Sequence, residues 1–195
     1  LPIRPLDAHK GTFGRVLIVA GSRSYVGAAY LACMGAYRAG AGLVTLAAPE
    51  SLYPIFAQKL TEVTHLPLPE AEPGIVAPEA SRILSEHLHE YQAAVIGCGL
   101  SSHSSVLEFI QRLLLSKPLP TPIVLDADAL NHLSQITNWW EYLEGTAILT
   151  PHPGEMSRLI DKPSEYIQAH RKDVSSEASK LWNTTVMLKG AFSLV

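Results

Sequence analysis

The sequence predicts an α/β protein with a mostly parallel central sheet and helices on both of its faces. Short runs of apolar, often β-branched residues alternate with helical patterns along the chain. These runs lack the polar–apolar alternation of half-exposed strands, which is typical of parallel strands buried on both faces. Polar or charged residues follow several of the runs, at the strand ends where α/β proteins bind their ligands.

Length and composition fit one globular domain covering residues 1–195. A chain of 195 residues buries about 70% of the surface of its unfolded state, so the core needs no disulfides. The net charge of −3 argues against a nucleic-acid partner, and no apolar run approaches the length of a membrane span. Cys33 and Cys98 are too few for a disulfide framework, and with no signal peptide in view we expect a cytoplasmic protein.

In the first half of the chain, glycine and proline mark the boundaries of the elements. Gly21 ends the first apolar run, Gly40 closes an Ala-rich helical stretch, and Pro49 ends the second strand. Two prolines and a glycine predict a loop over residues 70–78. The predicted strands are residues 15–20, 43–47 and 61–69, and the predicted helices are residues 26–39, 51–60 and 79–90.

The second half continues the same alternation. Its short apolar runs again end at glycine, aspartate, proline or lysine. The predicted strands are residues 93–97, 123–126, 146–150 and 185–189, and the predicted helices are residues 106–115 and about 165–182. We see no repeat and no linker, so the pattern indicates a single doubly wound sheet.

The run from Thr150 to Glu155, TPHPGE, is the most informative stretch. Pro151 and Pro153 hold His152 on a stiff, extended segment at the end of a buried strand. Pro153 can open the next helix, whose free N–H groups form a site for anions. A capped turn with a surface histidine explains the same residues without any function.

Two glycine-rich loops follow predicted strands, GSRSYVGAA at residues 21–29 and GCGLSS at residues 97–102. Their small residues let a ligand approach the backbone, and their N–H and O–H groups can bind phosphate. Neither loop matches a Walker A or a GxGxxG motif. Tight helix–strand packing and a serine-capped turn explain them about as well.

Charged residues end two further strands. Asp126 follows a buried Ile-Val-Leu run, where a carboxylate is costly unless it is paired or bound to a cation such as Mg²⁺. Asp128 can simply cap the next helix. Lys189 ends the last strand and can hold a phosphate as a point charge, or extend to solvent.

The chain resembles the ADP/ATP-dependent NAD(P)H-hydrate dehydratases, members of the ribokinase-like superfamily. The resemblance runs through the segments HKGTFGRV at 9–16, GAA at 27–29, RAGAGLV at 38–44, DADAL at 126–130, TPHPGE at 150–155 and LKGA at 188–191. It implies a ribokinase-like three-layer sandwich. It also implies repair of NADH or NADPH to which water has added.

The implied reaction is a lyase reaction that proceeds through a phosphorylation like that of a kinase. ADP or ATP phosphorylates the hydroxyl of the hydrate, and phosphate, a better leaving group than hydroxide, then departs. By position, Ala28, Ser101 and His152 would contact the hydrate, with Asp126 beside them, and Glu155 matches the residue that orders Mg²⁺. The nucleotide-binding positions would be Lys189, Gly190, Ala191, Phe192 and Ser193.

The chain departs from the family pattern at two places. Ser101 replaces the last glycine of the usual Gly-Pro-Gly-Leu-Gly; it keeps an N–H to donate, but its side chain takes up room in the site. The family's Gly-x-Gly-Asp motif, whose aspartate is the catalytic base, is expected beyond Val195. We therefore expect a protein truncated at both ends, and residues 1–195 alone to be inactive.

Three functions stay open at this point. A dehydratase is favoured, with a homotetramer and a fused N-terminal epimerase domain as further expectations from the resemblance. A small-molecule kinase of the same superfamily, acting on a vitamin precursor or a sugar, is the second. A nucleotide-binding module without catalysis is the third.

Overall fold

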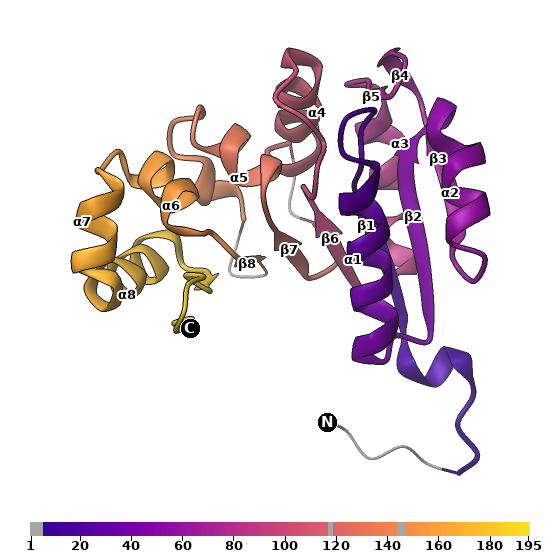
Figure 1. Cartoon of the computed structure of the whole chain (residues 1–195), viewed down its shortest axis with the longest axis horizontal. Coiled ribbons are helices and arrows are strands. Elements are labelled where there is room, and N and C mark those ends of the chain that lie inside the picture. Colours follow the sequence, from indigo (N-terminus) through magenta and orange to yellow (C-terminus); the bar gives the residue numbers. More distant parts are fainter. Residues whose placement is uncertain (1–5, 117–118, 144–146) are drawn as a thin grey trace.

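The computed structural model describes residues 6–116, 119–143 and 147–195, and within them it confirms the predicted α/β architecture. A seven-stranded sheet, parallel throughout, has the order β3-β2-β1-β6-β7-β8-β9 (Figure 1). Its strands are β1 (Arg15–Val19), β2 (Leu43–Pro49), β3 (Thr64–Leu68), β6 (Ala93–Ile96), β7 (Ile123–Leu125), β8 (Ala147–Leu149) and β9 (Thr185–Val186).

Helices pack on both faces of this sheet. They are α1 (Val26–Ala39), α2 (Tyr53–Lys59), α3 (Ala80–His87), α4 (Ser104–Leu114), α5 (Asp128–Leu133), α6 (Pro153–Ile160), α7 (Ser164–Ala169) and α8 (Arg171–Trp182). Each strand sends alternate side chains to opposite faces. Ile18 of β1 joins a core with α1 and α2, while Leu17 joins a larger core with the helices from α3 to α8.

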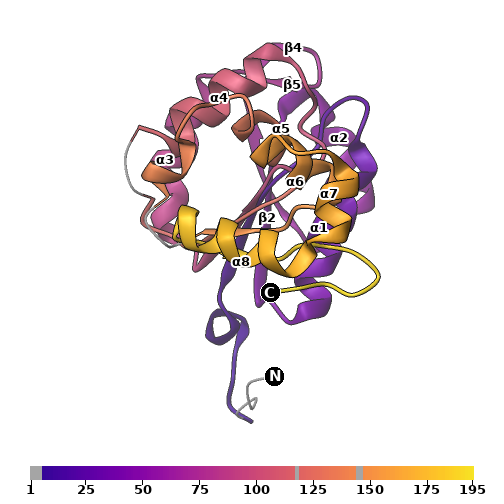
Figure 2. The same ribbon diagram turned by 90° about the vertical axis from the view of Figure 1, so that its left-hand side faces the viewer.

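The two cores differ in extent. The larger one reaches across the whole sheet from β3 to β9, and Figure 2 shows α6, α7 and α8 grouped at the β9 end of the molecule. The smaller one stops near β6. On its side of the sheet, Ile148 of β8 is 41% exposed and Met187, just after β9, is 36% exposed. Among the described residues, this face of the last strands therefore has no helix over it.

Two sequence predictions are wrong. Residues 70–78 are not a loop but hold a hairpin of β4 (Glu70–Glu72) and β5 (Ile75–Val76). The Glu70 carboxylate stabilises it by accepting the N–H of Gly74 and both the N–H and hydroxyl of Ser51. The helix predicted over residues 165–182 is broken at His170, which leaves helical geometry and stacks its ring on Tyr166.

Smaller differences concern boundaries. The α4 helix begins at Ser104, because His103 caps it by accepting the N–H of Ser105. The strand β9 ends at Val186, and β3 begins only at Thr64. The predicted start of a strand at residue 146 lies outside the described residues. No helix in the described part of the chain is long and apolar enough to span a bilayer.

The strand order places the site. All strands run the same way, so the segments that follow them gather at one edge of the sheet. The order reverses direction between β1 and β6, which is the switch point where open α/β sheets bind ligands. The two loops there are joined directly, since the N–H of Gly21 donates to the carbonyl of Cys98 at 2.9 Å.

Candidate functional site

An acidic residue, a lysine and a threonine meet at the ends of β7, β8 and β9. The Nζ of Lys189 donates to Oδ1 of Asp126 at 2.6 Å, and Oγ1 of Thr150 donates to the same oxygen at 2.8 Å. Parallel strands bring these residues together although Asp126 and Lys189 lie 63 positions apart in sequence. The charge of the partly buried Asp126 is therefore paired within the chain.

The Asp126 carboxyl is ionised in this setting. Burial acts to raise its pKa, but hydrogen bonds from Lys189 and Thr150, with the positive charge of Lys189, hold the pKa below its usual 3.8. A carboxylate with a low pKa is a weak base. Asp126 is therefore suited to holding a cation rather than to accepting a proton from a substrate.

The second oxygen of Asp126 faces a thiol. Sγ of Cys98, in the loop after β6, donates to Oδ2 of Asp126 at 3.6 Å. Burial, together with the Asp126 carboxylate, raises the pKa of Cys98 to about 12. Cys98 is thus a neutral, weak hydrogen-bond donor and not a nucleophile.

The TPHPGE run forms the capped start of α6. As predicted, the helix begins at Pro153, with His152 at the N-cap position. Nδ1 of His152 accepts the N–H groups of Gly154 (2.9 Å) and Glu155 (3.3 Å), and the Glu155 carboxylate accepts the N–H of His152 at 2.7 Å. These N–H groups are already used, so the anion site predicted at this helix start is wrong.

Glu155 is the buried charge of the site. Its side chain is 5% exposed; one oxygen lies 3.3 Å from Nε2 of His152 and the other 3.8 Å from Nζ of Lys189. The His152 ring is half exposed, and with Nδ1 accepting, its neutral form carries the proton on Nε2. His152 therefore presents a donor, not a base, at this edge.

The switch point carries the other two predicted substrate residues. Ala28, in the first turn of α1, packs against Gly99, where a Cβ on Gly99 would lie 2.8 Å from the Ala28 Cβ. Ser101 has a φ of 83°, a conformation that glycine adopts more easily. The fold therefore places Ala28 and Ser101 in the segments after β1 and β6, at the switch point, and His152, Asp126 and Lys189 at the ends of the neighbouring strands.

Ser101 is held from three sides. Its N–H donates to Oδ2 of Asp128 at 2.8 Å, its carbonyl lies 2.8 Å from Nε2 of His132, and its hydroxyl accepts the N–H of His103. Two expectations are thus wrong. Asp128 does not cap α5, whose N-cap is Ala127. The Ser101 N–H is already bonded, which leaves the hydroxyl proton for a ligand.

Arg171 fixes the predicted nucleotide segment. Its guanidinium donates to the carbonyls of Leu188 (3.1 Å), Lys189 (3.3 Å) and Phe192 (2.8 Å). Gly190 packs on the same guanidinium, where a Cβ would lie 2.8 Å from a terminal nitrogen. Much of the segment 190–193 is exposed, and Phe192 is 85% exposed, so this segment is available to a ligand.

A bridge around Glu72 ties the hairpin to the two switch-point loops. The Glu72 carboxylate bonds Arg23 of the β1–α1 loop at 2.9 Å and Nε2 of His103 of the β6–α4 loop at 2.9 Å. The carbonyl of Gly74 also accepts the N–H of Arg23. The hairpin that the sequence did not predict therefore holds the two switch-point loops together.

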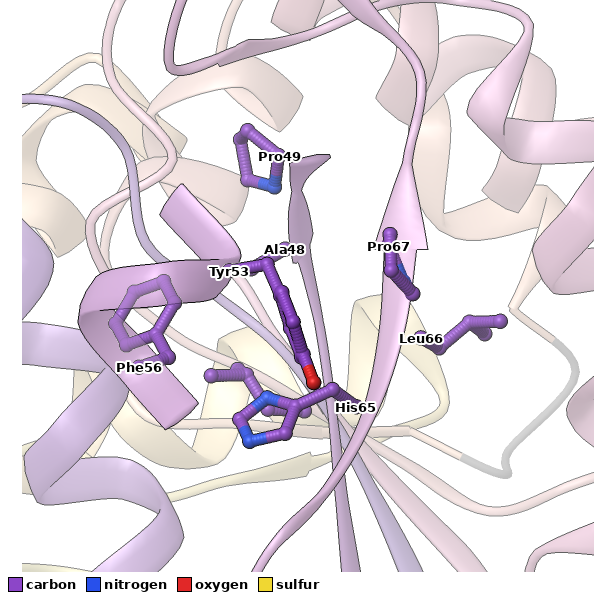
Figure 3. A pocket seen from close by; sticks show the side chains of 8 residues that line it. Ala48, Pro49, Tyr53, Phe56, His65, Leu66 and Pro67 are labelled. Atoms are coloured by element: carbon purple, nitrogen blue, oxygen red, sulfur yellow. The ribbon is translucent and has the colours of Figure 1, made fainter. Parts of the chain in front are cut away.

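The hollows found among the described residues lie away from this cluster. The one in Figure 3 has a volume of about 10 Å³, room for a single water, and lies between α2, β2 and β3 beside Tyr53 and His65. An open groove of about 630 Å³ follows α8 and β9, bounded by Lys172, Lys180 and Leu194. The groove reaches the end of the nucleotide segment, while the small cavity plays no part in the site.

Comparison with known families decides the identity of the domain. The family model described as NAD(P)H-hydrate dehydratase matches residues 16–195. The chain belongs to this family. The bifunctional NAD(P)H-hydrate repair enzyme Nnr of Moorella thermoacetica is 40% identical over the whole chain, which covers 36% of that protein.

Two further relatives agree with this assignment. The ADP-dependent (S)-NAD(P)H-hydrate dehydratase of Bacillus subtilis is 33% identical over 97% of the chain and 63% of its own length. A crystal structure of the Bacillus subtilis dehydratase, co-crystallized with ATP and Mg²⁺, matches with a TM-score of 0.78, at 32% identity over 99% of this chain and 64% of that one. The chain thus spans between about a third and two thirds of the length of these relatives.

Two carboxylates of the site suit the Mg²⁺ that this dehydratase family implies. The described residues hold no group of three or more His, Cys, Asp or Glu placed to bind a metal ion. Asp126 and Glu155 nevertheless supply two hard oxygen donors on either side of Lys189. Proteins commonly hold Mg²⁺ by one or two carboxylates, and waters and substrate phosphates complete its coordination. Asp126 and Glu155 can supply these two carboxylates.

Some residues of the site escaped the sequence reasoning. Thr150 stood in the TPHPGE run without a role, although its place directly after a buried strand was a usable signal. Arg171 carried no signal, because a helical arginine is ordinary. Glu72 fell in a segment predicted to be a loop, so its bridge was hidden.

Proposed function

We propose that the intact protein restores NADH and NADPH from their hydrates, using ADP or ATP as phosphoryl donor. The cluster of Asp126, Lys189, Glu155 and His152 at the sheet edge is the observation that carries the proposal. It places one cation, two carboxylates and a donor beside the switch point of the sheet. Kinase-type chemistry needs such groups to position a polyphosphate and a hydroxyl.

The chemistry proceeds in two balanced steps. The hydroxyl oxygen of the hydrate bonds to the terminal phosphorus of the nucleotide, the bond from that phosphorus to the nucleotide breaks, and the hydroxyl proton is removed. The carbon–oxygen bond then breaks, phosphate leaves, and a proton is lost from the neighbouring carbon to restore the ring double bond. Both steps depend on holding the two reactants at one edge of the sheet.

We assign the substrate side to the switch point. Gly99 packs so closely on Tyr25 and Ala28 that a side chain would not fit there, which holds the loop after β6 against the start of α1, and the Ser101 hydroxyl has a proton to donate. His152 presents an N–H from the other side. Asp126 contributes by holding Lys189 between these groups.

The nucleotide side is the segment from Lys189 to Ser193. Lys189 offers a charge for phosphate, and Arg171 keeps the backbone of residues 190–193 in place. Mg²⁺, when bound beside Glu155, would neutralise phosphate charge. We further propose a homo-oligomer and a cytoplasmic location for the intact protein.

The described carboxylates of the site are poor candidates for the general base. Asp126 is paired with Lys189, Glu155 accepts the N–H of His152, and Asp128 accepts that of Ser101. We propose that the base lies outside residues 1–195, and that these residues alone turn over no hydrate. Losing a positioned base costs on the order of 10²–10⁴ in rate.

The experiment offers NADH hydrate with ADP, and separately with ATP, to the intact protein and to residues 1–195. Recovery of dihydronicotinamide absorbance by the intact protein, with phosphate released in equal amount, is the expected result. A stable phosphorylated product from an alcohol panel, without hydrate turnover, would instead identify a small-molecule kinase. Efficient repair by residues 1–195 would show that a base exists among them.

A further inference from the structure

The hydroxyl of Thr150 contacts the Asp126–Lys189 pair but has no role in the proposed reaction. Its Oγ1 lies 2.8 Å from Oδ1 of Asp126, and this is the same oxygen that receives the ammonium of Lys189. Thr150 follows β8, Asp126 follows β7 and Lys189 lies just beyond β9, so the contact joins the ends of three neighbouring strands. The hydroxyl also lies 3.3 Å from the Leu125 carbonyl, but its single proton favours the shorter bond to a charged acceptor.

The backbone of Thr150 does not need this hydroxyl. Its N–H donates to the Leu125 carbonyl at 3.1 Å and so continues the pairing of β7 with β8. The hydroxyl therefore adds something other than strand pairing. The final torsion of an aspartate is soft, and the direction of its oxygens is set by their partners.

The carboxylate of Asp126 has partners of unequal strength. On Oδ2 it faces the weak thiol donor of Cys98 at 3.6 Å, whereas Thr150 and Lys189 both approach Oδ1. Without the hydroxyl, the carboxylate can turn about its soft torsion, and Lys189, which is 37% exposed, can follow it or move away. The Thr150 hydroxyl thus fixes the position of Oδ1 of Asp126, the oxygen that accepts the Lys189 ammonium.

We propose that Thr150 is a positioning residue, which fixes Asp126 and through it holds the Lys189 ammonium at the nucleotide side of the site. The ammonium is then already oriented for phosphate before the nucleotide binds. The effect on nucleotide binding rests on the proposed function, whereas the effect on Asp126 does not.

The test compares Thr150→Val, which keeps the shape and loses the hydroxyl, with Thr150→Ser, which keeps the hydroxyl. In the intact protein, the carboxyl ¹³C chemical shift of Asp126 is compared at one neutral pH, where it reports the hydrogen bonds that the carboxylate accepts, and ADP affinity is measured by calorimetry with Mg²⁺ present. The valine variant should shift the Asp126 resonance and weaken ADP binding about three- to tenfold, the range of one hydrogen bond. The serine variant should resemble the wild type in both.

The outcomes separate the two proposals. If the Asp126 resonance is the same in both variants and the wild type, Thr150 does not position the carboxylate and the inference is overturned. If the resonance moves in Thr150→Val but the wild-type protein itself does not bind ADP, the positioning role stands and the proposed function fails. Equal loss of affinity in both variants with an unmoved Asp126 resonance would indicate a packing role only, and would also overturn the inference.

Discussion

Replacing Gly97 with alanine tests how closely the site is packed against the sheet. Gly97 follows β6 with a φ of 126°, a conformation that L residues rarely adopt. An alanine Cβ there would lie 1.9 Å from the carbonyl oxygen of Asp126 and 2.9 Å from the backbone N of Ala129. Both neighbours are backbone atoms, so no side-chain rotation can relieve the contact.

The magnitude follows from two contributions. The unfavourable φ costs about 1–2 kcal/mol, and overpacking against fixed backbone costs about 1–3 kcal/mol. The free energy of unfolding should therefore fall by about 2–5 kcal/mol, a large part of the roughly 5–15 kcal/mol of a typical domain. The displaced Asp126 turn should also loosen the contact with Lys189, so ADP binding should weaken as well.

Urea denaturation measures the stability, and Gly35→Ala is the matched control. Gly35 lies inside α1, and no atom outside its own helix backbone comes within 4 Å of the place that a Cβ would take. Alanine there should stabilise the protein by about 0.5–1 kcal/mol. The same chemical change is thus expected to act with opposite signs at two glycines. A Gly97→Ala protein within about 1 kcal/mol of the wild type would refute the reasoning.

Three further predictions concern charged groups. Lys189→Met should destabilise the protein by about 1 kcal/mol at pH 7, a value reduced for the partial exposure of the pair. The pKa of Asp126 lies below 3.8, so the ion pair is lost when Asp126 is protonated at low pH. Urea unfolding repeated at decreasing pH should therefore show a shrinking difference between the variant and the wild type. Burial lowers the pKa of His65 below 6.5, so as pH falls the unfolded chain gains a proton before the folded protein does. The free energy of unfolding should therefore drop between about pH 7 and 5, and His65→Gln should make this drop smaller. The same dependence of the free energy of unfolding on pH in His65→Gln and the wild type would contradict the prediction. Glu72→Gln should cost only about 0.5–1 kcal/mol of stability but raise the KM for the hydrate, because the bridge joins the two loops at the switch point. An unchanged KM would show that the hairpin does not act on the site.

The strands of the sheet were predictable because a strand buried on both faces is an unbroken run of apolar residues in the sequence. The run that follows Arg15, at residues 16–20, contains no polar residue, and its strand proved to lie near the middle of the sheet. The hairpin at residues 70–78 was missed because its stability depends on Glu70 reaching Ser51, 19 positions away. Propensity describes a segment alone, and such a contact exists only after folding.

The site shows the same division. Parallel strands end at one edge, so the gathering of Asp126, His152 and Lys189 there was predictable from the strand ends, and the structure places them together. The partner of each polar group was not predictable. The His152 ring turned back to cap its own helix, and the Ser101 N–H went to Asp128, because a buried or partly buried donor bonds the nearest acceptor.

The charge balance of the cluster gives a reason for a cation in the reaction. Asp126 and Glu155 carry two negative charges, and Lys189 supplies one positive charge between them. The net charge of these three groups is thus negative, which repels a polyphosphate that approaches alone. In the proposed reaction Asp126 and Glu155 would hold Mg²⁺, whose charge would offset theirs, and Lys189 would remain for the phosphate. The proposal therefore predicts that a metal–nucleotide complex binds more tightly than the free nucleotide, at the same residues that join the ends of the last three strands.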